Sequence, residues 1–307
     1  VILMISIIIA VTLQLNISSR SGIYEAANLG DGIRAACAAK SGFYVGEALL
    51  IEDIKDLDSL NEDWANLESV SAGSGTLFDG EYFRLNIEDE SGRIPINKLV
   101  DGANDKIKKL LIRFLGLPEF DLDEQQVRDI LDAVKDWIDE DDEVTDFGAE
   151  NMYYKGLENP YACKNGPLDC IEELLMIKGI TEDLYYGAGE TSGIAKYFTL
   201  HGKGKININT APNLILKVLS DGITDEMVSN MDEYRRDEEN DLSAPEWYKK
   251  VAGMAGITID AGLITTKSDT FRITSTGYMN DISKRVSGVI ERHDNGKAIK
   301  ILSWKVD

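Results

Sequence analysis

The sequence is poor in the residues on which common catalytic and metal sites depend. Among 307 residues it has only two histidines, His201 and His293, and three cysteines. This scarcity argues against catalysis by a histidine pair and against a zinc site built mainly from histidine. The HExxH, GxGxxG, GxxxxGK[ST] and GxSxG motifs, which most directly indicate an enzyme, are absent as well. We therefore expect a protein that is not an enzyme.

Positive charge is also scarce. The chain has 32 Lys and Arg against 54 Asp and Glu, which gives a net charge of −22. Such a balance repels phosphate backbones and anionic lipid headgroups over the whole surface, so general nucleic-acid binding is disfavoured. Hydrophobic residues make up 43% of the chain. This content is enough to bury the core of one large domain or two modest ones.

The N-terminus is strongly apolar. Residues 1–13, VILMISIIIAVTL, contain no charge. A membrane span needs about 20 residues, and the chain begins at Val1 without an initiator Met, so we expect this run to be the C-terminal part of one transmembrane helix. A cleaved secretory signal is the alternative, but no A-x-A pattern follows the run. We expect residues 1–20 to be the membrane part of a longer helix that continues to about Leu60.

Strand patterns occur at both ends of the remaining chain. Residues 81–88 alternate apolar and polar side chains, and residues 93–97 resume as a short extended piece. Three further short strands are expected over 270–276, 285–291 and 297–304, the last two joined by a turn at 294–296. One antiparallel sheet built from both ends of the chain would give each of these strands a partner.

The middle of the chain has helical periodicity broken by Gly and Pro. Helices are expected over 107–115, 124–138, 168–177, 212–219, 225–234 and 245–252. The predicted class is therefore α+β, with a long N-terminal helix on an antiparallel β-sheet and a large α-helical insertion. We expect a core of residues 21–98 and 266–307, with the inserted domain spanning 99–265.

Three Gly-Ile-Thr units, at 179–181, 222–224 and 256–258, are typical of helix-hairpin-helix folds that bind DNA phosphates. Acidic residues follow two of these turns, which disfavours that function. The best basic patch, Lys106, Lys108, Lys109 and Arg113, lies in an acidic chain. A DNA-binding or DNA-uptake protein therefore remains an alternative only.

An acidic run covers residues 136–150, DWIDEDDEVTDFGAE, with eight acids and no Lys or Arg. Because like charges at contact distance repel one another, an ordered loop of this composition favours a bound cation. Ligands that are all oxygen favour Ca²⁺. Asp139, Asp141, Glu143 and Glu150 stand at offsets one, three, five and twelve of a calcium loop, although Val144 replaces the usual Gly. The alternatives are a solvated loop and, with less support, the paired carboxylates of a hydrolase.

Two further features have structural interpretations. Cys163 and Cys170 flank an Asn-Gly-Pro turn that can bring the two sulfurs together, so we expect a disulfide in an oxidising compartment, with two buried thiols as the alternative. In residues 205–212, KININTAP, Asn209 or Thr210 is expected to cap the helix that starts near Pro212. Catalysis by Asn207, Asn209 or Thr210 is the less favoured reading.

Taken in order, these motifs resemble a known family. The apolar N-terminal helix, EDESGRIPIN at 88–97, DWID at 136–139 with GAE at 148–150, and KININTAP at 205–212 are similar to the minor pseudopilin K family of type II secretion systems, also called general secretion pathway protein K. The resemblance covers nearly the whole chain. It implies a pilin-like core interrupted by an α-helical domain, and structural Ca²⁺ near the acidic loop.

The resemblance also implies a function. Such a protein assembles with the minor pseudopilins I and J at the tip of a periplasmic pseudopilus that supports export of folded proteins across the outer membrane. It is held in the bacterial inner membrane by a single N-terminal helix, and the bulk of the chain lies in the periplasm. We expect the same partners and location here, with no nucleic acid as ligand.

Overall fold

The structure is a computed structural model that describes residues 1–53, 56–100, 105–189, 191–293 and 298–307. Its contacts divide the chain into two units. We call residues 1–54, 63–88 and 272–307 the sheet unit, and residues 55–62 and 89–271 the helical unit. Both ends of the chain contribute to the sheet unit, and most of the helical unit lies between them in sequence.

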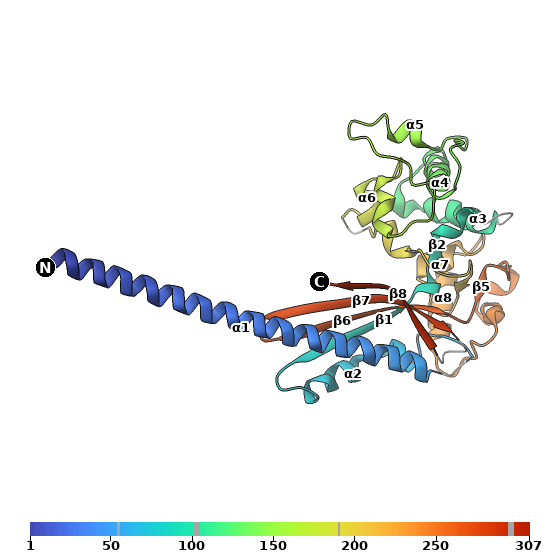
Figure 1. The fold of residues 1–307 in the computed structure, drawn as a ribbon. Coiled ribbons are helices and arrows are strands. Elements are labelled where there is room, and N and C mark those ends of the chain that lie inside the picture. The colour runs from blue at the N-terminus through green and yellow to red at the C-terminus, as the bar shows by residue number, and fades with distance from the viewer. Residues whose placement is uncertain (54–55, 101–104, 190, 294–297) are drawn as a thin grey trace. The chain divides into compact units, whose positions relative to one another are not determined.

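In the sheet unit a long helix packs on a four-stranded sheet (Figure 1). The strand order is β1-β6-β7-β8, and β7 and β8 are antiparallel. The expected α+β class, with a long helix on an antiparallel sheet, is confirmed. The elements are α1 (Ile2–Glu52), α2 (Glu68–Gly73), β1 (Tyr82–Asp89), β6 (Thr270–Met279), β7 (Ile282–His293) and β8 (Ala298–Val306).

Small residues bring α1 close to the sheet. The buried positions of α1 begin at Ala35 and recur at helical spacing to Leu50. A Cβ placed on Gly277 of β6 would lie 2.0 Å from the carbonyl oxygen of Ala35, so the two backbones approach as closely as glycine permits. A Cβ on Gly42 of α1 would lie 2.2 Å from Ser275 Oγ and 2.7 Å from the ring of Phe83. These contacts fix the C-terminal part of α1 on the sheet.

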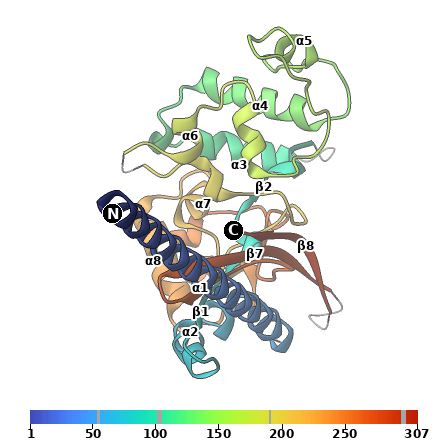
Figure 2. The same cartoon turned by 60° about the vertical axis from the view of Figure 1, so that its left-hand side comes forward.

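The first part of α1 has no such packing. Residues 1–30 are exposed throughout, and an 18-residue window of the helix has a mean hydropathy of 2.0. Among the described residues, α1 is the one helix long and apolar enough to cross a membrane. In Figure 1 the N-terminal end of α1 extends beyond the strands of the sheet, and Figure 2 shows the same helix from a second side. The helix ends at Glu52 rather than near Leu60, because Asp58 is held elsewhere by a backbone bond from its N–H to the oxygen of Thr266, 2.8 Å.

The helical unit has one hydrophobic core formed by short helices and turns. The two-residue strand β2 pairs in parallel with β3, and β4 pairs in parallel with β5, so residues 93–97 do not join the main sheet. The elements are α3 (Asp105–Leu115), α4 (Glu124–Ile138), α5 (Asn151–Tyr154), α6 (Glu182–Tyr186), α7 (Asn213–Val218), α8 (Asp225–Arg236), β2 (Ile94–Pro95), β3 (Phe198–Thr199), β4 (Ile206–Asn207) and β5 (Ile264–Thr265).

Several sequence predictions need correction at this level. The helices expected over 168–177 and 245–252 are 3-10 turns at Ile171–Met176 and Pro245–Lys250, too short to propagate α-helical bonding. The three C-terminal strands are present and longer than expected. The turn expected at 294–296 and the predicted start of the last strand at Lys297 lie outside the described residues.

Candidate metal centre

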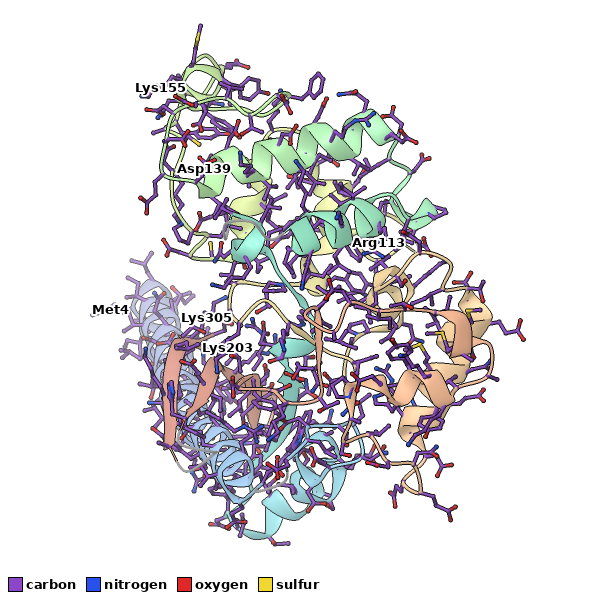
Figure 3. All side chains as sticks on the ribbon, turned by 90° about the vertical axis from the view of Figure 1, so that its right-hand side faces the viewer. Met4, Arg113, Asp139, Lys155, Lys203 and Lys305 are labelled. Atoms are coloured by element: carbon purple, nitrogen blue, oxygen red, sulfur yellow. The ribbon has the colours of Figure 1, made fainter. Side chains whose placement is uncertain are left out.

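The acidic loop follows directly from a well-defined helix. Asp123 caps α4 by accepting bonds from the N–H groups of Gln125 and Gln126, and the Gln126 side chain accepts from the N–H of Asp123. The apolar face of α4 is buried and includes Trp137. Because the helix ends at Ile138, the first acid of the loop, Asp139, stands at its C-terminus, as Figure 3 shows.

Three of the four predicted ligands come together. One carboxylate oxygen each from Asp139, Asp141 and Glu150 lies within 4.8 Å of the others. Glu150 is buried, at 2% exposure, and Asp139 is half-buried. Glu143 is exposed and is not part of this group; its N–H donates to Asp141 Oδ1 at 2.8 Å. The structure thus gathers three carboxylates and leaves the fourth in solvent.

The gathered oxygens are not satisfied by the protein itself. Within the described part of the chain, Asp139 Oδ1 and both carboxylate oxygens of Glu150 are buried without a hydrogen-bond partner. Burial raises the pKa of Asp139 to about 6, with repulsion from Asp141 as the next cause. Burial likewise raises the pKa of Glu150 to about 7. Unpartnered buried oxygens that resist ionisation are the environment that a bound cation stabilises.

Other contacts hold the loop in shape without an ion. The buried carboxylate of Asp136 accepts the N–H of Thr145 at 3.1 Å. A Cβ on Gly148 would lie 2.0 Å from Asp136 Oδ2, so only glycine fits there. Lys178 Nζ donates to the carbonyl oxygens of Phe147 and Gly148 at 2.9 and 3.1 Å. These contacts fix the course of the loop that carries the three carboxylates.

Asn165 is a contributor that the loop spacing did not indicate. Its Nδ2 donates to the backbone oxygen of Asp141 and to Asp142 Oδ1, and its own Oδ1 is buried without a partner among the described atoms. Its φ of 46° is in the left-handed region, which Asn tolerates. The Asn-Gly-Pro sequence is the only local signal at this position, and it indicates a turn between two cysteines rather than a contact with the acidic loop.

The chemistry of this donor set fits calcium. The group offers carboxylate oxygens from Asp139, Asp141 and Glu150, with backbone and amide oxygens close by, and these are the ligands that Ca²⁺ takes. No cysteine belongs to this group of gathered side chains among the described residues, so its ligands are all oxygen, whereas soft thiolate ligands would favour zinc or copper.

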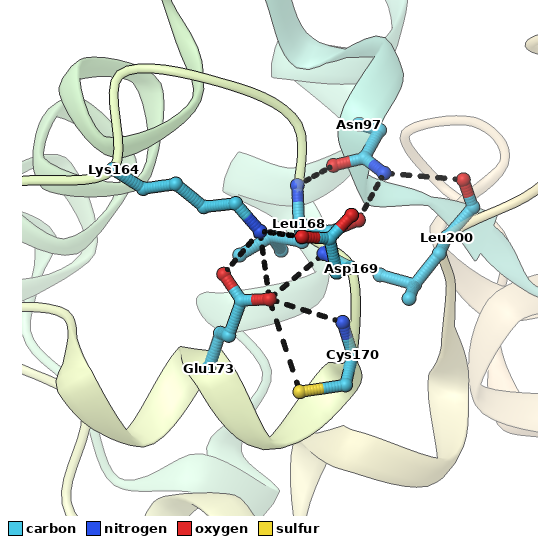
Figure 4. Close-up of polar contacts among 7 residues, drawn as sticks. All are labelled: Asn97, Lys164, Leu168, Asp169, Cys170, Glu173 and Leu200. Atoms are coloured by element: carbon cyan, nitrogen blue, oxygen red, sulfur yellow. Dashed lines mark hydrogen bonds and ion pairs between the residues drawn. The ribbon is translucent and has the colours of Figure 1, made fainter.

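The expected disulfide is not formed in this structure. Cys163 is buried and its Sγ contacts the carbonyl oxygen of Asp136 at 3.6 Å, whereas Cys170 is exposed. Lys164 and Glu173 instead connect the two ends of this turn. Lys164 Nζ bonds both Glu173 oxygens at 2.8 Å, and Glu173 accepts the N–H of Cys170 at 3.1 Å (Figure 4). An ion pair, rather than a disulfide, closes this turn.

The KININTAP segment forms a second buried polar cluster, which has a structural role. Asp89 Oδ2 accepts from Asn207 Nδ2 at 3.0 Å, from Thr210 Oγ1 at 2.6 Å and from Ser268 Oγ at 2.5 Å. Asn209 Oδ1 accepts from the indole N–H of Trp247 at 2.7 Å. The side chains of Asn207, Asn209 and Thr210 thus bond other buried groups of the cluster. The predicted cap on the following helix is wrong, because α7 has Pro212 at its N-cap and no side-chain cap.

The melting temperature of the metal-free chain should depend on pH, because Asp139 and Glu150 of the acidic loop titrate at different pH values in the folded and unfolded states. The folded-state pKa values of Asp139 and Glu150 lie above those of an unfolded chain, so the folded state binds more protons and loses stability as pH rises. We expect the melting temperature in chelator to fall between about pH 4 and pH 7 and then to level off. The variant carrying Asp139→Asn and Glu150→Gln should show a smaller fall; an equal fall would assign the effect to other groups. Differential scanning calorimetry measures both.

Comparison with known proteins finds relatives in one family of secretion proteins. Residues 92–187 match the family model for type II secretion system protein K. The chain is 24% identical over 224 residues to type II secretion system protein K of Aeromonas hydrophila, covering 68% of this chain and 65% of the relative. It is 30% identical over 193 residues to the Pseudomonas aeruginosa protein of the same name, covering 58% and 55%. The matched stretch thus spans less than two thirds of either relative.

A solved structure has the same fold. The crystal structure of the GspK-GspI-GspJ complex from the enterotoxigenic Escherichia coli type 2 secretion system contains a chain that matches with a TM-score of 0.64 and 17% identity. The match covers 95% of this chain and 99% of that one. The resemblance indicated by the sequence motifs is confirmed by these comparisons.

Proposed function

The chain is a relative of type II secretion system protein K, and from this premise we propose that it is a non-enzymatic minor pseudopilin at the tip of a type II secretion pseudopilus. The observation that carries the proposal is the interruption of a helix-on-sheet unit by a second unit of residues 89–271. The fold match to a chain in the GspK-GspI-GspJ complex supports the minor pseudopilins I and J as partners. In that role the protein supports export of folded proteins across the outer membrane.

The exposed apolar part of α1 would serve as both anchor and assembly surface. Residues 1–30 are all exposed in the part of the chain that the structure describes, and they carry most of the long aliphatic side chains of α1. In a bilayer such a helix is stable because its backbone bonds are internal. We place this part in the bacterial inner membrane as a single span, with the bulk of the chain in the periplasm.

We also propose a structural Ca²⁺ ion in the acidic loop. Asp139, Asp141 and Glu150 would hold it, and the ion would neutralise carboxylates that the fold has gathered and buried. Glu143 is left out of this ligand set because its side chain is exposed. The ion would fix the loop between α4 and α5, since both ends of the loop carry a ligand.

The DNA-binding alternative loses support in the structure. Thr181 and Thr224 cap α6 and α8 by accepting the N–H groups of Leu184 and Met227, so two of the three Gly-Ile-Thr units serve as helix starts. Three of the four cations in the basic patch face acids, as Lys106 with Asp260 at 3.0 Å, Lys108 with Asp132 at 3.5 Å and Arg113 with Asp221 at 3.8 Å. Paired cations of this kind offer little to a phosphate backbone.

The direct test is complex formation. We expect the full chain, purified in detergent, to elute with the minor pseudopilins I and J of the same secretion system as one ternary species. Size-exclusion chromatography with light scattering measures its mass. Elution of the chain apart from both partners, under conditions in which each is folded, would contradict the proposal. A DNA mobility shift at low salt serves as the control for the alternative function.

A further inference from the structure

The two edges of the four-stranded sheet differ, and α2 with the turn after it occupies part of the β1 edge. Ser74 Oγ donates to the carbonyl oxygen of Phe83 at 2.9 Å and accepts the N–H of Phe83 at 3.0 Å. Ser71 Oγ accepts the N–H of Leu85 at 3.1 Å. These serines, on α2 and the turn after it, satisfy outward backbone groups of β1. A further strand would therefore meet occupied backbone groups at Phe83 and Leu85 on this edge.

The β8 edge is open. Within the described residues β8 pairs with β7 alone. Arg285 and Asp307 exchange both backbone bonds, at 3.2 and 2.9 Å, so they form a hydrogen-bonded pair. In an antiparallel ladder such pairs alternate with pairs whose N–H and C=O groups point outward. Trp304 and Val306 are at the outward positions, opposite Gly288 and Val286, so their backbone groups lie along the free edge.

The side chains of β8 divide between two faces. Trp304 lies against Phe43 of α1, with ring centroids 4.6 Å apart, and still has 39% of its surface exposed. Val306 is 47% exposed and shares this face, since both residues stand opposite even-numbered positions of β7. Lys300 and Lys305 stand opposite Glu291 and Ser287 and share the other face. Figure 3 labels Lys305 on this strand.

Charge and aromatic content indicate what the edge accepts. β8 carries two lysines and no acid in a chain whose net charge is −22. The ion pair of Lys305 with Asp307, at 3.2 Å, is exposed on both sides and contributes little. A half-exposed Trp beside unpaired main-chain groups is the arrangement by which sheets bind an added strand, with the backbone giving affinity and alternate side chains giving specificity.

We propose that the β8 edge binds an extended segment of a neighbouring pseudopilin, with apolar side chains on the Trp304 face and acidic side chains on the Lys300 and Lys305 face. This inference rests on the proposed function and names the surface that one of its partners uses. A second copy of this chain fits poorly, because antiparallel pairing of two β8 strands about their middle brings Lys300 of each near Lys305 of the other.

The test removes the edge without disturbing the ladder. Val306→Pro deletes an outward N–H that makes no bond to β7, so the sheet should keep its melting temperature. We expect this variant to bind immobilised pseudopilin I or J at least about tenfold more weakly than the unmodified full chain, and the variant with Lys300→Glu and Lys305→Glu to bind about tenfold more weakly at low salt. Lys284→Glu, an exposed lysine on β7, is the matched control and should bind normally.

The outcomes separate the two proposals. Normal binding of both β8 variants to I and J, with the ternary complex intact, would overturn the edge inference and leave the proposed function standing. Failure of the unmodified chain to bind either partner would contradict the proposed function itself. Loss of a homodimer by Val306→Pro, with binding to I and J unchanged, would assign the edge to a second copy and overturn the inference. Calorimetry of each variant confirms that it is folded.

Discussion

Calcium added to the metal-free full chain is expected to raise its melting temperature by roughly 5–10 °C. At a calcium concentration about 100 times the dissociation constant, binding to the folded state alone stabilises it by about 2.7 kcal/mol, and a unit of this size converts each kcal/mol into about 2–4 °C. The gain arises because the ion provides the partner that the buried oxygens of Asp139 and Glu150 lack. Isothermal titration with calcium chloride, after dialysis against chelator, gives the stoichiometry.

Two variants and one control make this result specific. Asp139→Asn and Glu150→Gln each keep the side-chain shape and remove a charged ligand, so each should abolish or strongly reduce the shift. Glu143→Gln makes the same chemical change at an exposed position of the same loop, outside the group of gathered carboxylates, and should keep the shift. A lost shift in Glu143→Gln, or an unchanged one in Glu150→Gln, would mean that the ligand set is wrong.

The sequence could predict elements whose causes are local. α4 begins and ends where its pattern indicates, because the capping box at Asp123 and the periodic apolar face lie within the helix itself. The strands expected at 270–276 and 285–291 lie within β6 and β7, because their composition and the turns between them are also local features. The end of α1 was placed too late, since the apolar pattern continues past Glu52 while a distant partner, Thr266, holds Asp58 outside the helix.

The candidate metal centre likewise has one part that local spacing predicts and another part that depends on the fold. Spacing along one loop indicated Asp139, Asp141 and Glu150, but spacing also included Glu143, whose orientation is set by a turn in which its N–H bonds Asp141. Lys178 and Asn165 reach the loop from later segments, and no local pattern relates them to it. The density of acids could predict that a cation binds, whereas the ligand set required the fold.

The second large effect is expected from Asp89→Ala in the helical unit. Asp89 is buried, and its two oxygens accept four bonds, from Asn207, Thr210 and Ser268 and from the N–H of Ser91. Burial raises the pKa of Asp89, and the four donors oppose this rise. Removing the carboxylate leaves those donors buried without an acceptor, so we expect the free energy of unfolding to fall by about 3 kcal/mol.

Urea unfolding measures this loss, and two further variants locate its cause. Asp221→Ala removes an exposed carboxylate, 3.8 Å from Arg113, and should change the free energy of unfolding by less than about 0.5 kcal/mol. Asp89→Asn keeps one acceptor oxygen and should lose less than Asp89→Ala. If Asp89→Ala were as stable as the Asp221→Ala control, the cluster would not hold the KININTAP segment in place, and the segment would be free for a role in binding. Asn207 and Ser268, two of the donors to Asp89, also contact Asp58 and each other, so the loss of this carboxylate should affect the whole cluster.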